Sequence, residues 1–191
     1  MTGKPSFELK DLDGVARAYP SSRPTLLCFV KEDCETCNTA APVIESLHRA
    51  YGTEADVWMI SQTSEGSLIL RDRHGLTLPI LDDSDLKTSF AYDFSIVPAL
   101  YWFSDGETVE TAFEGFVKSE WQDLDVAVAV KLESERAGID WDDLPDWRPG
   151  CGSKHLDPEI HDQLRAEAED SPIRARKIEV ASADDVAEFM F

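Results

Sequence analysis

The stretch from Thr25 to Gly52 constrains the fold of this chain more than any other, because it joins an apolar run to a helix-like pattern through a Cys-x-x-Cys pair. Residues 25–30 (TLLCFV) are almost all apolar or β-branched, as a strand buried on both faces requires. After Cys34 and Cys37, apolar residues recur every three or four positions up to Gly52, which predicts one helix with a single buried stripe. The pair therefore lies at a helix N-terminus, where unpaired backbone N–H groups favour a thiolate and redox chemistry.

Two prolines extend the pattern around this pair. Pro42 falls five residues after the second cysteine, and Val97-Pro98 stands directly before the apolar run 99–103. With these residues, the stretch from about Ser6 to Glu135 resembles the thioredoxin superfamily, which has a helix-kinking proline and a cis-proline at such places. The order of the expected elements is similar to that of the TlpA/ResA and AhpC/TSA branch of this superfamily.

The resemblance implies an α/β fold with a thioredoxin-like mixed sheet flanked by helices, followed by an irregular and helical C-terminal extension. It also implies a dithiol–disulfide oxidoreductase in which Cys34 is the exposed nucleophile and Cys37 is the buried resolving thiol. Val97 and a cis Pro98 would then lie beside the sulfurs, where members of the family pair with an extended substrate. The peroxidases of the superfamily carry Pro and Thr before their cysteine, and neither stands there in this chain.

The residues around the pair depart from the family pattern in two ways. Glu32, Asp33 and Glu35 place three acids near Cys34, which predicts a raised pKa for its thiol and therefore a more reducing couple. This favours a reductase over an oxidase. Cys28 stands where thioredoxin has a buried acid, and we expect it to be a small core residue rather than a proton acceptor.

The net charge of the chain limits the classes of partner that it can bind. The 191 residues include 38 acids against 18 Lys and Arg, a formal net charge of −20, which repels phosphate backbones and anionic membrane surfaces. We therefore expect no nucleic-acid or membrane partner, but a protein or small-molecule thiol or disulfide substrate. The sequence identifies neither that substrate nor the electron donor.

Two features of the sequence predict a cytoplasmic protein. The first residues lack the basic start and apolar core of a signal peptide, and four cysteines make no disulfide framework at this length.

Residues 1–136 are expected to form the thioredoxin-like domain. Alternation, turn signals and apolar spacing predict its remaining strands and helices. The expected strands are 7–10 in an opening hairpin, 55–61, 78–81, and the hairpin 99–103 with 108–116; the expected helices are 64–75, 83–92 and 118–136.

Residues 137–191 are expected to form a C-terminal arm. Helical spacing predicts a helix over 158–169, a short strand over 178–180, and a further helix that begins at Ser182. The arm ends on Phe-Met-Phe at residues 189–191, which raises the alternative that the chain is an interaction or delivery module ahead of a fused or partner catalytic domain.

Cys151 lies in the arm between two glycines, and two interpretations of it remain open. It is either a third redox thiol or an incidental surface thiol. A different class of site uses the same atoms, because Cys34, Cys37, Cys151 and His155 have a two-part spacing that a structural zinc ion accepts.

The first part of the arm, residues 137–157, is expected to fold back over the domain. Trp141, Leu144 and Trp147 need a surface to bury against, and the apolar surface around a thioredoxin-like active site is a suitable one. We therefore expect Cys151 to approach the Cys-x-x-Cys pair.

Overall fold

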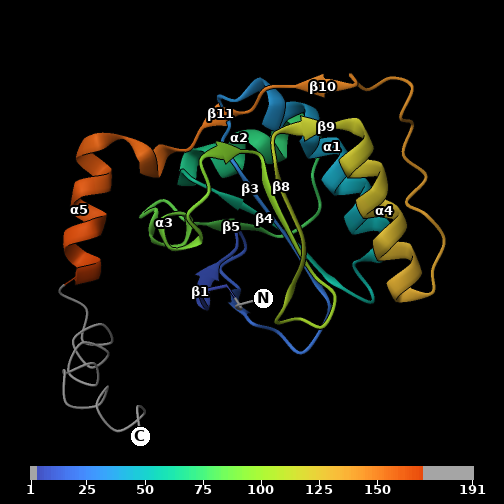
Figure 1. The fold of residues 1–191 in the computed structure, drawn as a ribbon, viewed down its shortest axis with the longest axis horizontal. Helices are drawn as coiled ribbons and strands as arrows, with labels where there is room; N and C mark the ends of the chain where they lie inside the picture. Colours follow the sequence, from blue (N-terminus) through green and yellow to red (C-terminus); the bar gives the residue numbers. More distant parts are fainter. Residues whose placement is uncertain (1–3, 170–191) are drawn as a thin grey trace, which may run out of the picture.

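The computed structural model describes residues 4–169 and contains a five-stranded mixed sheet with helices on both sides (Figure 1). The strand order is β5-β4-β3-β7-β8. The three parallel strands are β3 (Thr25–Val30), β4 (Asp56–Ser61) and β5 (Ile80–Asp82), and the antiparallel ones are β7 (Ala99–Phe103) and β8 (Val109–Glu114). The mixed α/β sheet expected from the sequence is confirmed.

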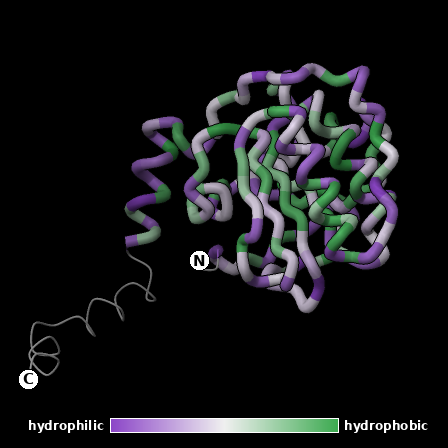
Figure 2. The backbone as a smooth tube through the Cα atoms, turned by 45° about the vertical axis from the view of Figure 1, so that its right-hand side comes forward, coloured by the Kyte–Doolittle hydropathy of each residue, from purple (hydrophilic) through white to green (hydrophobic). Residues whose placement is uncertain are grey.

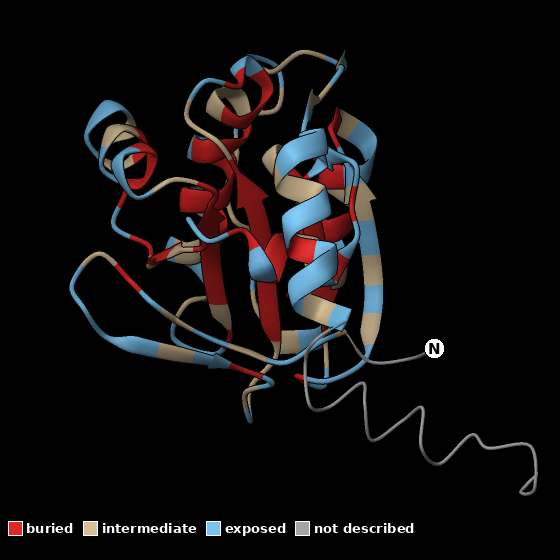
Figure 3. Cartoon of the chain, turned by 90° about the vertical axis from the view of Figure 1, so that its left-hand side faces the viewer, coloured by how far each residue is buried: buried red, intermediate tan, exposed pale blue. Residues whose placement is uncertain are grey.

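The centre of the sheet is buried on both faces. Every residue of β3 and β7 is buried, whereas β8 alternates between half-buried and exposed residues, as an edge strand does. Hydrophobic residues follow the central strands in Figure 2, and Figure 3 shows these strands buried along most of their length. The apolar run 25–30 therefore forms the core strand that its composition predicts.

Helices α1 (Glu35–Tyr51), α2 (Ser64–His74) and α4 (Lys118–Leu132) lie together, since α1 contacts the other two. The Tyr51 hydroxyl donates to the Asp125 carboxylate over 2.6 Å, which joins α1 to α4. On the other side, the short helix α3 (Lys87–Tyr92) brings Tyr92 against Phe29 of β3. The hairpin of β1 (Phe7–Lys10) and β2 (Ala16–Tyr19) completes this side, because Tyr19 contacts Tyr92 as well.

Two helices are shorter than the sequence predicts. Helix α3 begins at Lys87 instead of residue 83, because the buried carboxylate of Asp83 accepts hydrogen bonds from the backbone N–H groups of Thr88 and Ser89 and so belongs to the turn before the helix. Burial raises the pKa of Asp83 to about 6. Helix α4 ends at Leu132 instead of residue 136, since the next residue, Glu133, has a positive φ of 53°.

The arm runs back across the molecule after α4, along the edge drawn uppermost in Figure 1. Two short strand pairs hold it: β10 (Trp147–Arg148) pairs with β9 (Phe116–Val117), and β11 (Cys151–Gly152) pairs with β6 (Ile96–Val97). A 3-10 turn, η1 (Lys154–Leu156), and helix α5 (Pro158–Glu169) follow, and both contact α3. The strand expected over 178–180 and the helix expected from Ser182 lie outside the described residues.

No helix within residues 4–169 is long and apolar enough to span a bilayer.

Candidate active site

Cys34 is the residue at which the chain passes from the loop after β3 into helix α1. Its backbone is extended, with φ −96° and ψ 116°, and its Sγ takes the place of a capping side chain by accepting from the Cys37 N–H over 3.3 Å. Helix α1 continues through Pro42, as the sequence predicts. The first cysteine sulfur therefore lies at the positive end of a seventeen-residue helix dipole.

Hydrogen bonds to Cys34 and the burial of Cys37 give the two thiols of the pair very different pKa values. The pKa of Cys34 is lowered to about 5, first by a hydrogen bond from the Cys37 thiol and further by the Cys151 thiol and the N–H groups of Thr36 and Cys37, while burial opposes the shift. The pKa of Cys37 is raised well above its ordinary value, mainly because it is buried and also because its proton is donated to Cys34. At neutral pH the first sulfur is a thiolate and the second keeps its proton.

The expectation that nearby acids raise the pKa of Cys34 is wrong. Asp33 forms an ion pair with Lys31 over 3.5 Å, and Glu35 forms one with Arg148 of the arm over 3.3 Å. Asp33 and Glu35 are thus each paired with a cation. The pKa of Cys34 is instead set mainly by the hydrogen bonds that its sulfur accepts.

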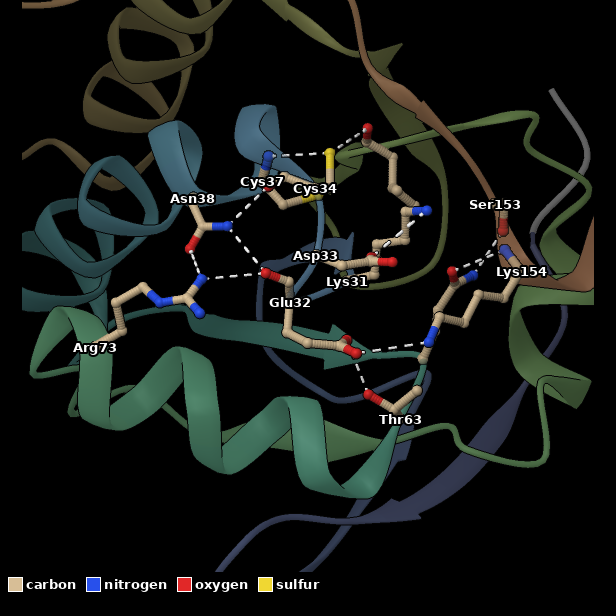
Figure 4. A network of polar contacts seen from close by, with 12 residues as sticks. Lys31, Glu32, Asp33, Cys34, Cys37, Asn38, Thr63, Arg73, Ser153 and Lys154 are labelled. Atoms are coloured by element: carbon tan, nitrogen blue, oxygen red, sulfur yellow. Dashed lines mark hydrogen bonds and ion pairs between the residues drawn. The ribbon is translucent and has the colours of Figure 1, made fainter.

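Glu32, the third acid, also has partners of its own. It accepts a hydrogen bond from the Thr63 hydroxyl over 2.9 Å and lies 3.6 Å from the Lys154 ammonium (Figure 4). Its backbone carbonyl accepts from the Asn38 side chain over 3.0 Å. Glu32 therefore ties the loop before Cys34 to α1, to the residues after β4 and to the arm.

Val97 and Pro98 lie beside the sulfurs where the resemblance places them. The peptide bond between them is cis, and the Val97 carbonyl oxygen lies 3.6 Å from the Cys34 Sγ, where it accepts from the Cys34 thiol in the protonated form. Val97 is buried, and the Pro98 carbonyl accepts from the Gly115 N–H over 2.7 Å, which fixes the loop to the turn after β8.

The arm brings Cys151 to the same place. Cys151 is the strand partner of Val97 in the β11–β6 pair, and the Thr36 hydroxyl at the start of α1 donates to the Pro149 carbonyl. The pKa of Cys151 is raised to about 11, first by burial and then by the hydrogen bond that it donates to Cys34. The expected approach of Cys151 to the pair is confirmed, because Cys34 and Cys151 both lie beside Val97.

Two expectations about exposure are wrong. Cys34, expected to be the exposed sulfur, is 0% exposed, and the Val97 carbonyl and Cys151 of the arm lie against its sulfur. Trp147 was expected to anchor the arm by burial, yet it is 63% exposed. Trp141 and Leu144 are half-buried against the core, so the arm is held by a few apolar contacts and by hydrogen bonds.

His155, the fourth residue of the zinc alternative, does not join the three sulfurs. It is buried among aromatic rings, 5.2 Å from that of Phe94, and its Nδ1 lies 2.7 Å from the Ser153 hydroxyl. Within residues 4–169, no group of three or more His, Cys, Asp or Glu side chains is arranged to hold a metal ion. The Cys34, Cys37, Cys151 and His155 zinc site is therefore contradicted, because η1 turns the histidine toward α3.

One buried polar residue near the site, Gln62, was missed from the sequence. The buried Gln62 side chain donates to the hydroxyls of Ser153, over 2.6 Å, and Ser89, over 3.0 Å, and accepts from the Lys154 N–H over 3.1 Å. This amide therefore links the arm to α3 across the end of β4. Its position directly after a buried strand was the available signal, but its partners lie 27 to 92 residues away along the chain.

Cys28, expected in the core, is fully buried in β3. Burial raises the pKa of its thiol far above the ordinary value, so that it stays protonated.

The fold and site together define a class: the chain has the thioredoxin-like fold, with a Cys-x-x-Cys pair at a helix N-terminus beside a cis-proline. No protein-family model matches it, and no curated protein does. Solved structures with the same fold are similar over about two thirds of this chain.

Three of these structures illustrate the likeness. A candidate thiol:disulfide interchange protein DsbE from Chlorobium tepidum has a TM-score of 0.62 at 15% identity, covering 69% of this chain and 96% of its own. The thioredoxin domain of a thiol-disulfide oxidoreductase from Bacteroides vulgatus has a TM-score of 0.57 at 12% identity, covering 66% and 96%. A secreted Mycobacterium tuberculosis disulfide oxidoreductase homologous to E. coli DsbE has a TM-score of 0.54 at 18% identity, covering 65% and 95%.

Proposed function

We propose that this chain catalyses thiol–disulfide exchange, with Cys34 as the nucleophile and Cys37 as the resolving thiol. One observation carries the proposal: the pKa of Cys34 is lowered to about 5 at a helix N-terminus while the adjacent Cys37 keeps its proton. The structural neighbours, which are described as thiol-disulfide oxidoreductases, support the same class of reaction.

The steps of the reaction follow from the difference in pKa between Cys34 and Cys37. The Cys34 thiolate attacks one sulfur of a substrate disulfide, forms a mixed disulfide and releases the other sulfur as a thiolate. Cys37 then loses its proton and attacks the Cys34 sulfur, so that a Cys34–Cys37 disulfide forms and the reduced substrate leaves. Run backwards, the same steps oxidise a dithiol.

Deprotonation of Cys37 is expected to limit the second step. Cys37 is fully buried, its pKa is raised, and the nearby Cys28 cannot take up its proton, because burial keeps Cys28 protonated as well. The first step needs no such proton transfer, since Cys34 is already a thiolate at neutral pH.

The backbone at Val97 is the expected binding edge for an extended substrate. Strand β6 pairs with β11 of the arm, which demonstrates that its edge accepts an antiparallel strand beside the Cys34 sulfur. We infer a protein or peptide disulfide as the substrate class, bound by main-chain hydrogen bonds.

The direction of exchange was expected to be reduction because acids surround Cys34. That argument fails, since each acid has a partner and the pKa of Cys34 is lowered. A stabilised thiolate stabilises the reduced form, which shifts a couple toward oxidation. The direction of exchange in this protein therefore stays a prediction, and the redox potential of the Cys34/Cys37 couple tests it.

Insulin-type disulfide reduction with a dithiol electron donor tests the proposal. We expect the wild type to accelerate the reaction and Cys34→Ser to return it to the uncatalysed rate. Cys28→Ala is the matched control, since it removes a cysteine outside the site and should keep activity. Equal rates for wild type and Cys34→Ser would overturn the proposal and favour the interaction-module alternative.

A further inference from the structure

The arm occupies the strand position that an external substrate would use. Cys151 is the register partner of Val97 and Gly152 that of Ile96, and the Ser153 N–H donates to the Ser95 carbonyl over 3.0 Å. This is antiparallel strand addition to the edge beside the nucleophile.

The fit of the arm at this edge depends on Gly150. A Cβ at Gly150 would overlap the Ile96 side chain and lie 2.6 Å from the Val97 carbonyl oxygen, so a side chain there would push the arm away. A Cβ at Gly152, two residues further along, would meet nothing within 4 Å. The backbone therefore approaches Val97 most closely just before the cysteine.

Anchors on both sides keep this segment in place. Before Cys151, Arg148 pairs with Glu35 of α1 over 3.3 Å. After it, the Ser153 hydroxyl accepts from the buried Gln62 amide over 2.6 Å. The next residue, Lys154, reaches from the arm to Glu32 in the loop before Cys34 (Figure 4).

We propose that residues 147–153 are a built-in substrate of the Cys34/Cys37 pair, and that Cys151 exchanges with Cys34 to form an internal disulfide. Two observations carry this inference: the thiol of Cys151 lies beside Cys34 on a strand paired with Val97, and the nucleophile is 0% exposed while the arm is docked. The inference rests on the proposed function, because a protein or small-molecule disulfide must first oxidise the pair.

The internal step is balanced without a further oxidant. From the Cys34–Cys37 disulfide, Cys151 loses its proton and its thiolate attacks the Cys34 sulfur. A Cys34–Cys151 bond forms, the Cys34–Cys37 bond breaks, and Cys37 takes up the proton. An external thiolate attacks the half-exposed Cys151 sulfur more readily, because Cys34, with the lower pKa, is the better leaving group.

The first test asks whether the internal disulfide forms. Cys37→Ser is treated with oxidised glutathione and its intact mass is measured. We expect a glutathione adduct on Cys34 that resolves to an internal disulfide, with the loss of two hydrogens relative to the reduced protein and a Cys34–Cys151 link in the peptide map. Cys37→Ser/Cys151→Ser is the control and should keep one glutathione. A stable adduct in both proteins would overturn the proposal.

The second test asks whether the arm covers the nucleophile. Gly150→Ala and Gly152→Ala are compared in the Cys37→Ser/Cys151→Ser protein, where Cys34 and Cys28 are the remaining thiols. We expect Gly150→Ala to raise the alkylation rate of Cys34 by about tenfold over Gly152→Ala, as overpacking of about 1.4 kcal/mol predicts. Cys28 should stay unlabelled, which reports that the domain remains folded. Equal Cys34 rates would overturn the proposal.

These outcomes separate the two proposals. If the proposed function fails, Cys34→Ser matches the wild type in disulfide reduction even with Gly150→Ala present. If only the built-in substrate fails, Gly150→Ala leaves Cys34 reactivity unchanged while the wild type still reduces disulfides.

Discussion

The acidity of Cys34 comes from hydrogen bonds rather than from a cation. The largest contribution is the Cys37 thiol, followed after burial by the Cys151 thiol and two backbone N–H groups. Lys31, the nearest basic residue in the sequence, pairs with Asp33 instead. In the proposed reaction, the second cysteine therefore activates the first before it resolves the mixed disulfide.

A pair of variants at Cys37 tests this cause. Cys37→Ala removes the donor and should raise the pKa of Cys34 by about one to two pH units, because a hydrogen bond to a charged group is worth about 1.5 to 3 kcal/mol. Cys37→Ser keeps a donor and should change it less. The ultraviolet absorbance of the thiolate, titrated against pH with Cys34→Ser as the blank, measures both. An equal pKa in the two variants would contradict the assignment.

The same shift predicts how stability depends on pH. Folding lowers the pKa of Cys34 from 9.0 to about 5, so the unfolded chain holds a proton that the folded one lacks between these values. The free energy of unfolding of the reduced protein should therefore rise with pH over this window, by at most about 1.4 kcal/mol per pH unit, and lose this contribution as pH falls through about 5. Denaturation series of wild type and Cys34→Ser check this, since the variant should lack the rise.

The sequence predicts the position of each sulfur but not its surroundings. The strand–helix junction and the two prolines place Cys34, Cys37 and Val97 correctly, because that geometry is local to the chain. The acids near Cys34 were misread, because Glu35 finds its partner 113 residues away in the arm. Local spacing cannot reveal a charge that distant residues neutralise.

Among the elements, α4 and the start of the arm depend on one buried acid. Asp125 is 1% exposed and accepts from the Tyr51 hydroxyl, the Arg136 guanidinium over 2.8 Å and the Ala137 N–H over 3.0 Å. It thus joins α1 and α4 to the residues where the chain turns back.

Asp125→Ala should lower the free energy of unfolding by about 2 to 4 kcal/mol, because it removes the buried carboxylate that accepts from the Tyr51 hydroxyl, the Arg136 guanidinium and the Ala137 N–H. Asp123→Ala is the matched control, since Asp123 is an exposed acid on the same helix, and should stay within about 0.5 kcal/mol of the wild type. Chemical denaturation measures both. A loss below 1 kcal/mol at Asp125 would show that these contacts are dispensable.

The elements themselves were largely predictable. Alternation and apolar runs locate the central strands, the β7–β8 hairpin and α5, since each carries its own pattern. The start of α3 could not be predicted, because the buried Asp83 side chain, rather than helical spacing, sets it. The strand pairs of the arm also leave no pattern, since two residues each are too few to show one.

For the molecule as a whole, the direction of electron flow follows from the redox potential of the Cys34/Cys37 couple. The acids near Cys34 led us to expect a reducing couple from the sequence. With the pKa of Cys34 at about 5, we expect the midpoint between about −230 and −120 mV, above that of thioredoxin. Equilibration with glutathione measures it, in Cys151→Ser so that a single couple is present. A midpoint near −270 mV would restore the reductase interpretation.

While the arm is docked, any external substrate must compete with Cys151 for the Cys34 sulfur. Cys151 belongs to the same chain as Cys34, so its effective concentration at the site is that of a tethered group, on the order of millimolar for a flexible link. A free thiol or disulfide in the micromolar range competes poorly against it. A protein that offers a whole strand to the edge at Val97 gains the same main-chain contacts as the arm, and further contacts elsewhere on its surface let it displace the arm. If the arm acts as proposed, we expect the site to favour protein partners that bind tightly over small-molecule thiols and disulfides.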